Sequence, residues 1–188
     1  MSTYPMTHPM PTIDRSLLAP YEGSKVLITG GTGYIGSNLL HKLAGVDCHI
    51  TLLSREGHGL ELDGSALARI TTASGDLTSS ETWKKALPGI NHVFHLAAQT
   101  SAYVAAQEPF TDLDANVVPV LRMLEVCREE GMQPKVLFAG TATEVGITST
   151  TPVDESFADH PATIYDVHKL AAEKYLQYYS ETIGIETA

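Results

Sequence analysis

Short apolar runs alternate with amphipathic segments along most of the chain. The runs are rich in β-branched and aliphatic residues and predict strands at residues 25–29, 49–53, 69–73, 92–98 and 135–139. The first run is apolar on both faces, which is typical of a buried parallel strand, whereas the run at 69–73 is a weaker candidate. Helical spacing predicts helices at 35–43, 79–87, 109–130 and 161–183. Strands that alternate with helices indicate βαβ units, so we expect an α/β fold whose parallel sheet is covered on both faces.

Two segments lack sustained periodicity. Residues 1–23 contain four prolines and predict an N-terminal extension that is mobile or lies along the surface, ahead of one domain at 24–188. Residues 141–160 are expected to be loop. Pro119 lies inside the long helical segment and predicts a kink or a late helix start there.

Composition narrows the class of protein. The 188 residues carry 12 Lys plus Arg against 22 Asp plus Glu, and the resulting net charge of −10 argues against a nucleic-acid partner. No apolar run approaches the roughly 20 residues that span a bilayer, and the N-terminus is no secretory signal. Cys48 and Cys127 lie in patterned segments and suggest free buried thiols in a reducing, cytoplasmic setting. The scattered histidines include no H-E-x-x-H spacing, so we expect no metal site.

The most informative motif is a glycine turn between the first strand and the first helix. It satisfies both G-x-x-G-x-x-G and G-x-G-x-x-G, and its candidate cofactor contacts are Gly30, Thr32, Gly33, Tyr34, Ile35 and Gly36. Glycines let the backbone approach a pyrophosphate, whose charge suits the helix N-terminus. The alternative is a purely structural strand–turn–helix corner. The context predicts a Rossmann-type doubly wound sheet that binds a dinucleotide.

The end of the second strand discriminates between nicotinamide cofactors. An acidic residue there suits the ribose hydroxyls of NAD, whereas this chain has Ser54 and Arg55. A hydroxyl and a guanidinium suit the 2′-phosphate of NADP, so we favour NADP, with NAD possible. Arg55 could instead stack on adenine or point into solvent. Asp76 and Leu77 are placed to meet the adenine amino group, although Asp76 could equally cap the next helix.

A tyrosine and a lysine one turn apart share a face of the last predicted helix. The Lys169 ammonium is expected to lower the pKa of Tyr165, which makes Tyr165 a candidate acid/base for alcohol–ketone interconversion. Thr141, just after the fifth strand, is the candidate hydroxyl that shares the substrate oxygen, and Thr143 is the runner-up. An exposed amphipathic pair is the alternative explanation of Tyr165 and Lys169.

These motifs together resemble the extended short-chain dehydrogenase/reductase family, which includes nucleotide-sugar epimerases and dehydratases. The resemblance rests on the glycine turn, 75–77, 93–98, Asn116, 138–146 and the Tyr165–Lys169 pair. It implies that Tyr165 is the acid/base, that Lys169 holds the ribose and that Thr141 completes the catalytic set. It also implies that Leu96, Ala97, Ala98 and Gln99 line the cofactor channel beside Asn116. A nucleotide-linked sugar substrate and a homodimer through the long helices are implied as well, with Tyr175, Tyr178 and Tyr179 in the core or the interface.

Several positions depart from the family's patterns. Ala142 and Thr143 stand where 4,6-dehydratases carry an Asp-Glu pair, which disfavours that chemistry. Gly140 and Val145 replace a Ser and a Tyr usual in 4-epimerases, and His168 replaces a Ser and is expected to be a neutral helix-surface residue.

The sequence ends with residues 184–188, where the resemblance implies that a sixth strand begins, so the smaller substrate lobe of the family is expected to be absent from it. A fragment, one half of a split enzyme and a natural truncation all fit. We therefore expect an NAD(P)-dependent epimerase-type oxidoreductase, with a regulatory NAD(P)-binding module without turnover as the alternative.

Overall fold

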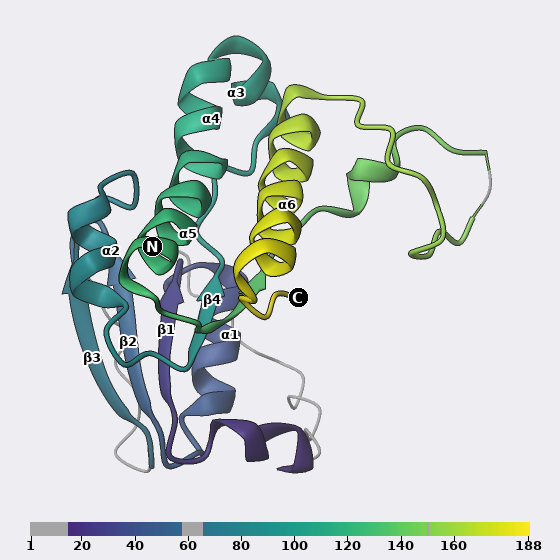
Figure 1. The fold of residues 1–188 in the computed structure, drawn as a ribbon. Coiled ribbons are helices and arrows are strands. Elements are labelled where there is room, and N and C mark those ends of the chain that lie inside the picture. The colour runs from purple at the N-terminus through teal and green to yellow at the C-terminus, as the bar shows by residue number, and fades with distance from the viewer. Residues whose placement is uncertain (1–14, 58–65, 150) are drawn as a thin grey trace.

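The computed structural model describes residues 15–57, 66–149 and 151–188. In this part of the chain a single parallel sheet has the order β3-β2-β1-β4-β5 (Figure 1). The strands are β1 (Lys25–Thr29), β2 (His49–Ser54), β3 (Arg69–Ser74), β4 (His92–His95) and β5 (Lys135–Phe138). The predicted α/β architecture with a doubly wound parallel sheet is therefore confirmed.

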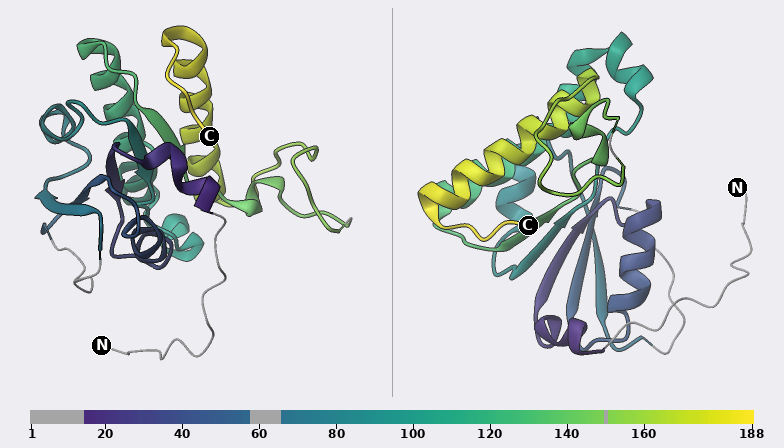
Figure 2. Two further views of the ribbon diagram at one scale, coloured as in Figure 1. Left: turned by 90° about the horizontal axis from the view of Figure 1, so that it is seen from below. Right: turned by 90° about the vertical axis from the view of Figure 1, so that its right-hand side faces the viewer.

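Helices cover both faces of this sheet. They are α1 (Tyr34–Leu43), α2 (Ser80–Ala86), α3 (Ala102–Gln107), α4 (Pro109–Asn116), α5 (Val118–Glu130) and α6 (Ile164–Ile183), with short 3-10 helices η1 (Arg15–Tyr21) and η2 (Ala142–Val145). Figure 2 shows α1 on one face and α5 with α6 on the other. None of the described helices is both long and apolar enough to cross a bilayer.

Successive side chains of β1 divide between the two cores, as the two-residue period of a strand requires. Val26 and Ile28 pack in the α1 core, whereas Leu27 packs in the core under α2, α5 and α6. Both free cysteines are buried as expected, Cys48 in the first core and Cys127 in the second. Burial raises the pKa of Cys127 to about 12, so this thiol stays protonated.

The long helix expected at 109–130 is interrupted. It divides at Val117 into α4 and α5, and Pro119 lies in the first turn of α5, where its missing N–H costs no hydrogen bond. Of the two outcomes predicted from Pro119, a kink or a late helix start, the structure shows the helix start.

Residues 15–21 of the predicted N-terminal extension form η1 and pack against the protein. Leu18 and Tyr21 contact the α1 core, and the Tyr21 ring lies 4.9 Å from the His92 ring. The prediction for residues 1–14 falls outside the described residues. At the other end of the chain, Thr187 pairs in parallel with Val136 of β5, so the expected sixth strand begins there.

Candidate functional site

The candidate site lies at the carboxyl edge of the sheet. Because all paired strands are parallel, the segments that follow β1, β2, β4 and β5 emerge at this one edge. Those segments contain most of the residues singled out above. Ligands of open α/β sheets bind in the crevice at this edge, where the strand order reverses, which here is between β1 and β4.

The glycine turn after β1 is built with no space for side chains. Gly30 has a φ of +69°, and a Cβ on it would lie 2.7 Å from the backbone N of Ala97. A Cβ on Gly36 would lie 2.3 Å from the carbonyl oxygen of Gly30. No side chain caps the N-terminus of α1, and Tyr34 and Ile35 in its first turn are exposed. The turn therefore offers free backbone N–H groups and positive helix-end potential, which fits a pyrophosphate.

The end of β2 carries an unsatisfied polar atom. The Oγ of Ser54 is buried and has no hydrogen-bond partner among the described residues, whereas the neighbouring Arg55 is exposed. A buried hydroxyl without a partner is costly unless a ligand or water satisfies it. This strand end therefore fits the ribose end of a dinucleotide.

Asp76 and Leu77 are engaged in the turn that leads into α2. Asp76 accepts a hydrogen bond from the N–H of Thr78 at 2.9 Å, and its pKa is lowered by hydrogen bonds from Thr78 and by the charge of Arg55. The Leu77 carbonyl accepts a 2.7 Å hydrogen bond from the indole N–H of Trp83, which is fully buried. Asp76 thus stabilises the turn before α2 but does not cap this helix, because the N-cap residue of α2 is Ser79. Its exposed carboxylate lies at the carboxyl edge of the sheet.

The strand predicted over 92–98 ends earlier, at His95. Beyond it the N–H of Ala97 donates to the Thr29 hydroxyl at 3.2 Å, so Leu96, Ala97 and Ala98 leave the sheet beside the glycine turn. His95 is a buried core histidine whose Nδ1 lies 3.0 Å from the Thr29 Oγ1 and whose Nε2 has no hydrogen-bond partner among the described residues. Burial lowers the pKa of His95 to about 3, so its ring is neutral.

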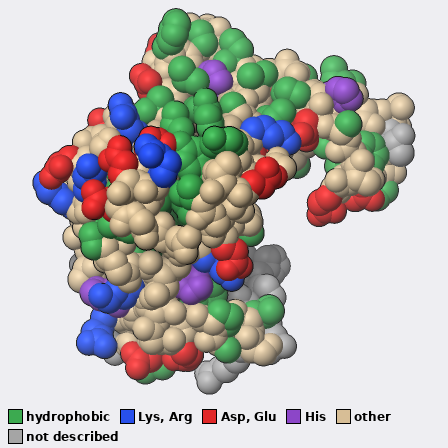
Figure 3. Space-filling model, in the orientation of Figure 1, with side chains coloured by type: hydrophobic (Ala, Val, Ile, Leu, Met, Phe, Trp, Pro, Cys, Tyr) green, Lys and Arg blue, Asp and Glu red, His purple; other side chains and the backbone are tan. Residues whose placement is uncertain are grey.

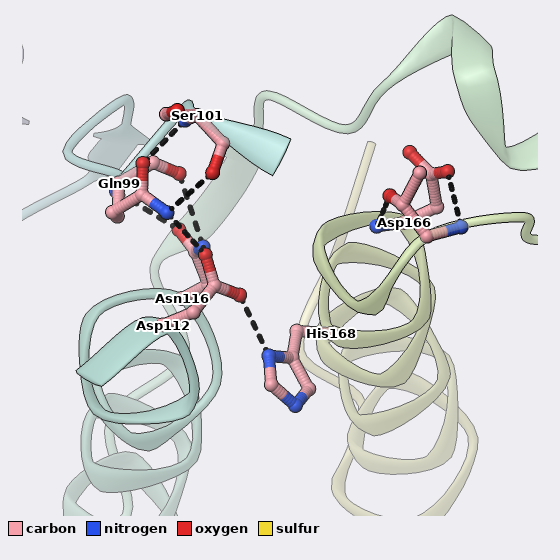
Figure 4. A network of polar contacts seen from close by, with 7 residues as sticks. Gln99, Ser101, Asp112, Asn116, Asp166 and His168 are labelled. Carbon is pink, nitrogen blue, oxygen red and sulfur yellow. Dashed lines mark hydrogen bonds and ion pairs between the residues drawn. The ribbon is translucent and has the colours of Figure 1, made fainter. Parts of the chain in front are cut away.

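A buried polar network positions the next residue, Gln99 (Figure 4). The Asn116 side chain accepts from the Gln99 N–H at 3.1 Å and donates to its carbonyl oxygen at 3.0 Å. The Gln99 amide donates to Asp112 at 2.6 Å, and Asn116 donates to the same carboxylate oxygen at 3.0 Å. Asn116 is 1% exposed, so its role in the structure is to hold the loop that contains Gln99.

His168 is not the helix-surface residue that we expected. Its Nδ1 lies 2.6 Å from an oxygen of Asp112, and its side chain is only 15% exposed against 0% for Asp112 (Figure 4). The surface prediction was wrong because Asp112, from a different helix, supplies a partner that the spacing within α6 does not reveal. His168 and Asp112 tie α6 to α4.

Tyr165, Thr141 and Lys169 converge from two elements. Tyr165 and Lys169 lie in the first two turns of α6, and the side chain of Thr141 lies close enough to Tyr165 to act on its pKa, which it lowers. Thr141 is the N-cap of η2, and its Oγ1 lies 2.8 Å from that of the runner-up, Thr143. The structure therefore brings all four of these residues together.

The pKa of Tyr165 is raised, contrary to the lowering expected from Lys169. Burial is the main cause, and the negative charges of Asp112, Asp166 and Glu144 add to it. The Lys169 ammonium is 2% exposed and lies 3.8 Å from the centre of the Phe138 ring. Burial lowers the pKa of Lys169 to about 8. Burial, with the neighbouring carboxylates, thus outweighs the lowering that the helical spacing suggests.

Two carboxyl groups beside this site, those of Glu144 and Glu173, were not predicted from the sequence. Glu144 is 7% exposed and accepts from the Thr141 N–H at 3.3 Å, and the nearby charge of Glu173 raises its pKa. A Cβ on Gly140 would lie 2.1 Å from an oxygen of Glu173, so the Glu173 carboxylate packs directly over the backbone at Gly140. The spacing Thr141-x-x-Glu144 is a capping box and could have revealed η2 within the predicted loop.

A pH-dependent stability follows from Glu144. Burial and the charge of Glu173 raise the pKa of Glu144 from 4.5 to about 7, so between these values the folded chain binds more protons than the unfolded chain. The free energy of unfolding therefore falls as pH rises through this window. Glu144→Gln is expected to remove this loss and to have a higher urea midpoint than wild type above pH 7. The exposed Glu155→Gln is the control, and a wild-type-like pH profile for Glu144→Gln would contradict the assignment.

The fold and the site together define a class of protein. The chain has a doubly wound parallel sheet, a glycine turn followed by a helix whose N-terminus no side chain caps, and an unsatisfied hydroxyl at the end of the next strand. These features together define a dinucleotide-binding domain. Residues 26–188 match the model of the NAD dependent epimerase/dehydratase family, and the chain belongs to this family.

Similar proteins are sugar-nucleotide 4-epimerases. UDP-glucuronate 4-epimerase 1 of Arabidopsis thaliana is 28% identical, and the match covers 87% of this chain and 40% of that protein. The UDP-Glc/GlcNAc 4-epimerase of Campylobacter jejuni has a TM-score of 0.77 at 26% identity, over 88% of this chain and 52% of that one. The UDP-glucose 4-epimerase of Thermus thermophilus, in complex with NAD, has a TM-score of 0.74 at 29% identity, over 87% and 53%. The chain thus spans about half the length of these solved structures.

Proposed function

We propose that this chain is the cofactor-binding part, residues 24–188, of an NAD(P)-dependent oxidoreductase that acts on the sugar of a nucleotide-linked hexose. Residues 1–23 are its N-terminal extension. The observation that carries the proposal is the convergence of Thr141, Tyr165 and Lys169 at the edge where the glycine turn emerges. A module that only binds the cofactor needs the glycine turn alone. The additional hydroxyls of Thr141 and Tyr165 and the buried amine of Lys169 therefore favour an enzyme.

The proposed chemistry assigns one task to each residue. When bound, the nicotinamide supplies hydride acceptance and donation. Tyr165 moves the proton of the sugar hydroxyl, Thr141 hydrogen-bonds the same oxygen, and Lys169 binds the nicotinamide ribose. Ala142 and Thr143 provide no acid–base pair for water elimination, so we favour epimerisation or ketone reduction over 4,6-dehydration. Similarity to UDP-glucose and UDP-glucuronate 4-epimerases supports a UDP-hexose as substrate.

A cytoplasmic homodimer is part of the proposal. Apolar side chains gather over the helices α4, α5 and α6 on the face shown in Figure 3. Among the residues of these helices, Phe110 and Tyr178 are 79% and 59% exposed, whereas Tyr179 is buried and bonds Glu125. A second copy of the chain would cover this surface. Sedimentation of the chain at several concentrations tests the dimer.

The proposed cofactor is NADP, although the family is NAD-dependent and a similar structure is named as an NAD complex. The support is the buried Ser54 hydroxyl beside Arg55, where an acidic residue would suit NAD. Calorimetric titration with NADPH and NADH is expected to show tighter binding of NADPH. Arg55→Gln is expected to weaken NADPH binding about tenfold, because a charge-assisted hydrogen bond is lost, and to leave NADH binding unchanged.

Arg69→Gln is the matched control for this titration. Arg69 is exposed at the first residue of β3, at the opposite edge of the sheet, so its loss should change neither affinity. A preference for NADH would overturn the NADP assignment and leave the NAD-dependent family intact. Binding of neither cofactor would overturn the function proposed for residues 24–188.

A further inference from the structure

The buried carboxylate of Asp112 lies where three segments of the proposed site meet. Asp112 belongs to α4, is fully buried, and contacts Gln99 of the loop after β4 and His168 of α6 (Figure 4). The same loop lies beside the glycine turn, because the Ala97 N–H donates to the Thr29 hydroxyl at its start. Asp112 therefore joins the loop beside the glycine turn to the helix that carries the proposed acid/base and the buried lysine.

The two side-chain amides that contact Asp112 each have only one possible orientation. The Oε1 of Gln99 accepts the Ser101 N–H, and its Nε2 donates to the Ser101 carbonyl oxygen at 2.9 Å. The Oδ1 of Asn116 accepts the Gln99 N–H, and its Nδ2 donates to the Gln99 carbonyl oxygen. Backbone N–H groups only donate and carbonyl oxygens only accept, so these contacts determine which end of each amide is the NH₂ group. Both NH₂ groups donate to Oδ1 of Asp112.

The other oxygen of Asp112 is bound by His168. Its Oδ2 lies 2.6 Å from Nδ1 of His168, which in the described part of the chain is the only hydrogen-bond donor to this oxygen. Two N–H groups on Oδ1 favour the ionised form of the Asp112 carboxyl group. A carboxylate has no hydrogen to give, so Nδ1 of His168 must carry the hydrogen of this bond.

We propose that Asp112 and His168 are positioning residues, in which the Nδ1–H of His168 holds the Asp112 carboxylate and the carboxylate holds the Gln99 loop at a fixed place relative to α6. The loop and α6 form two walls of the proposed cofactor crevice. Without the Nδ1–H group, a buried carboxylate would lack a donor, which is costly, and it would turn away from the loop to find one. The statement about the cofactor rests on the proposed function, whereas the statement about the loop does not.

Asp112 also acts on the proposed catalytic residues through its charge, and a test must separate this effect from positioning. Burial, and then the charge of Asp112, raises the pKa of Tyr165. Burial lowers the pKa of Lys169, and Asp112 is one of the carboxylates that oppose the change. Variants of His168 leave the Asp112 carboxylate in place, so they test the positioning role without removing this charge.

The decisive comparison is His168→Ala with His168→Asn. Asparagine carries its NH₂ group on Cγ, where histidine carries Nδ1, so it can donate to Asp112 from the same place. Neither replacement is charged, so the comparison isolates the donated hydrogen. We expect the Gln99 N–H to exchange with solvent about tenfold faster in His168→Ala and at close to the wild-type rate in His168→Asn. NMR of the cofactor-free chain measures this exchange, and the amide of Leu124 in α5 serves as the reference for global unfolding.

Nitrogen NMR of the His168 ring tests the contact itself. Nδ1 is expected to carry a hydrogen in the wild type throughout the pH range in which the chain is folded, and His168→Asn identifies the resonance. In Asp112→Asn, the asparagine oxygen stays with the two NH₂ groups of Gln99 and Asn116, so its own NH₂ group faces Nδ1. The neutral ring should then carry its hydrogen on Nε2.

Three outcomes would overturn the proposal. The first is a wild-type ring without a hydrogen on Nδ1. The second is a Gln99 amide that exchanges in His168→Ala as slowly as in the wild type, relative to the amide of Leu124. The third is equally fast exchange in His168→Ala and His168→Asn, because the loop would then depend on the imidazole ring and not on a donated hydrogen.

Cofactor affinity measures the consequence for the crevice. The dissociation constant of NADPH or NADH, whichever binds more tightly, is expected to rise about fivefold in His168→Ala and to stay near the wild-type value in His168→Asn. His41→Ala is the control, because His41 is exposed in the last turn of α1 on the other face of the sheet, and it should change neither exchange nor affinity. Faster Gln99 exchange with unchanged affinity would overturn the effect on the crevice. A chain that shows the expected exchange and binds neither cofactor would retain the positioning role and lose the proposed function.

Discussion

In an enzyme that joins this cofactor-binding part to its substrate lobe, Tyr165→Phe is expected to reduce turnover of a UDP-hexose by about 10²–10⁴-fold, because the variant keeps the ring and loses the phenol that is the proposed acid/base. The dissociation constant of the cofactor should stay within about a factor of two, since a hydroxyl that handles the sugar proton contributes little to binding the dinucleotide. Chromatographic analysis of the conversion of UDP-glucose to its 4-epimer measures turnover, and calorimetry measures the affinity.

Tyr175→Phe controls for the loss of a phenol from the same helix. Tyr175 is 39% exposed and lies more than two turns beyond Tyr165, so its variant should retain wild-type turnover. Equal losses in both variants would indicate that α6 itself had been disturbed. Wild-type turnover in Tyr165→Phe would rule out Tyr165 as the acid/base.

The strands could be predicted from the sequence because their apolar runs are continuous and end at glycine or a polar residue. The weakest of them, β3, illustrates the limit. Its residues are mostly exposed at the sheet edge, so they lack the apolar character that marks β1 and β2. Pairing with β2 along its whole length, and not the burial of an apolar face, holds β3 in the sheet.

The short helices α3 and η2 escaped prediction for a different reason. Each has fewer than seven residues, too few for periodicity to emerge, and each is stabilised at its start by a capping side chain, Ser101 or Thr141. Only the capping pattern distinguishes such turns from loop.

The residue types of the site were predictable, but their electrostatics were not. Spacing along α6 places Lys169 one turn from Tyr165, and it contains no information about Asp112 or Glu144, which come from other elements and raise the pKa of Tyr165. The same lack of information about partners made His168 look like a surface residue. Contacts between elements distant in sequence decide protonation, and a single sequence does not record them.

Gly36→Ala is expected to destabilise the chain by about 3 kcal/mol, near the upper end of what overpacking costs. The added Cβ would lie 2.3 Å from the Gly30 carbonyl oxygen and 2.7 Å from the Gly31 Cα. Both atoms belong to the backbone of the glycine turn, so no side-chain rotation relieves the clash, and α1 must move away from β1. Urea unfolding measures the loss of stability. Cofactor affinity should fall as well, because the N–H groups of α1 lose their position at the sheet edge.

Gly45→Ala is the control that separates the clash from the general effect of adding a methyl group. A Cβ on Gly45, just beyond α1, would have only the Lys42 carbonyl oxygen nearby, at 3.9 Å, and its φ is not in the left-handed region. The free energy of unfolding of Gly45→Ala should differ from wild type by less than about 1 kcal/mol. It should increase if the main effect of alanine is to reduce the conformational entropy of the unfolded chain. If Gly36→Ala were as mild as Gly45→Ala, α1 would not be held against the glycine turn as closely as the structure places it. The pyrophosphate position inferred from that contact would then have to be abandoned.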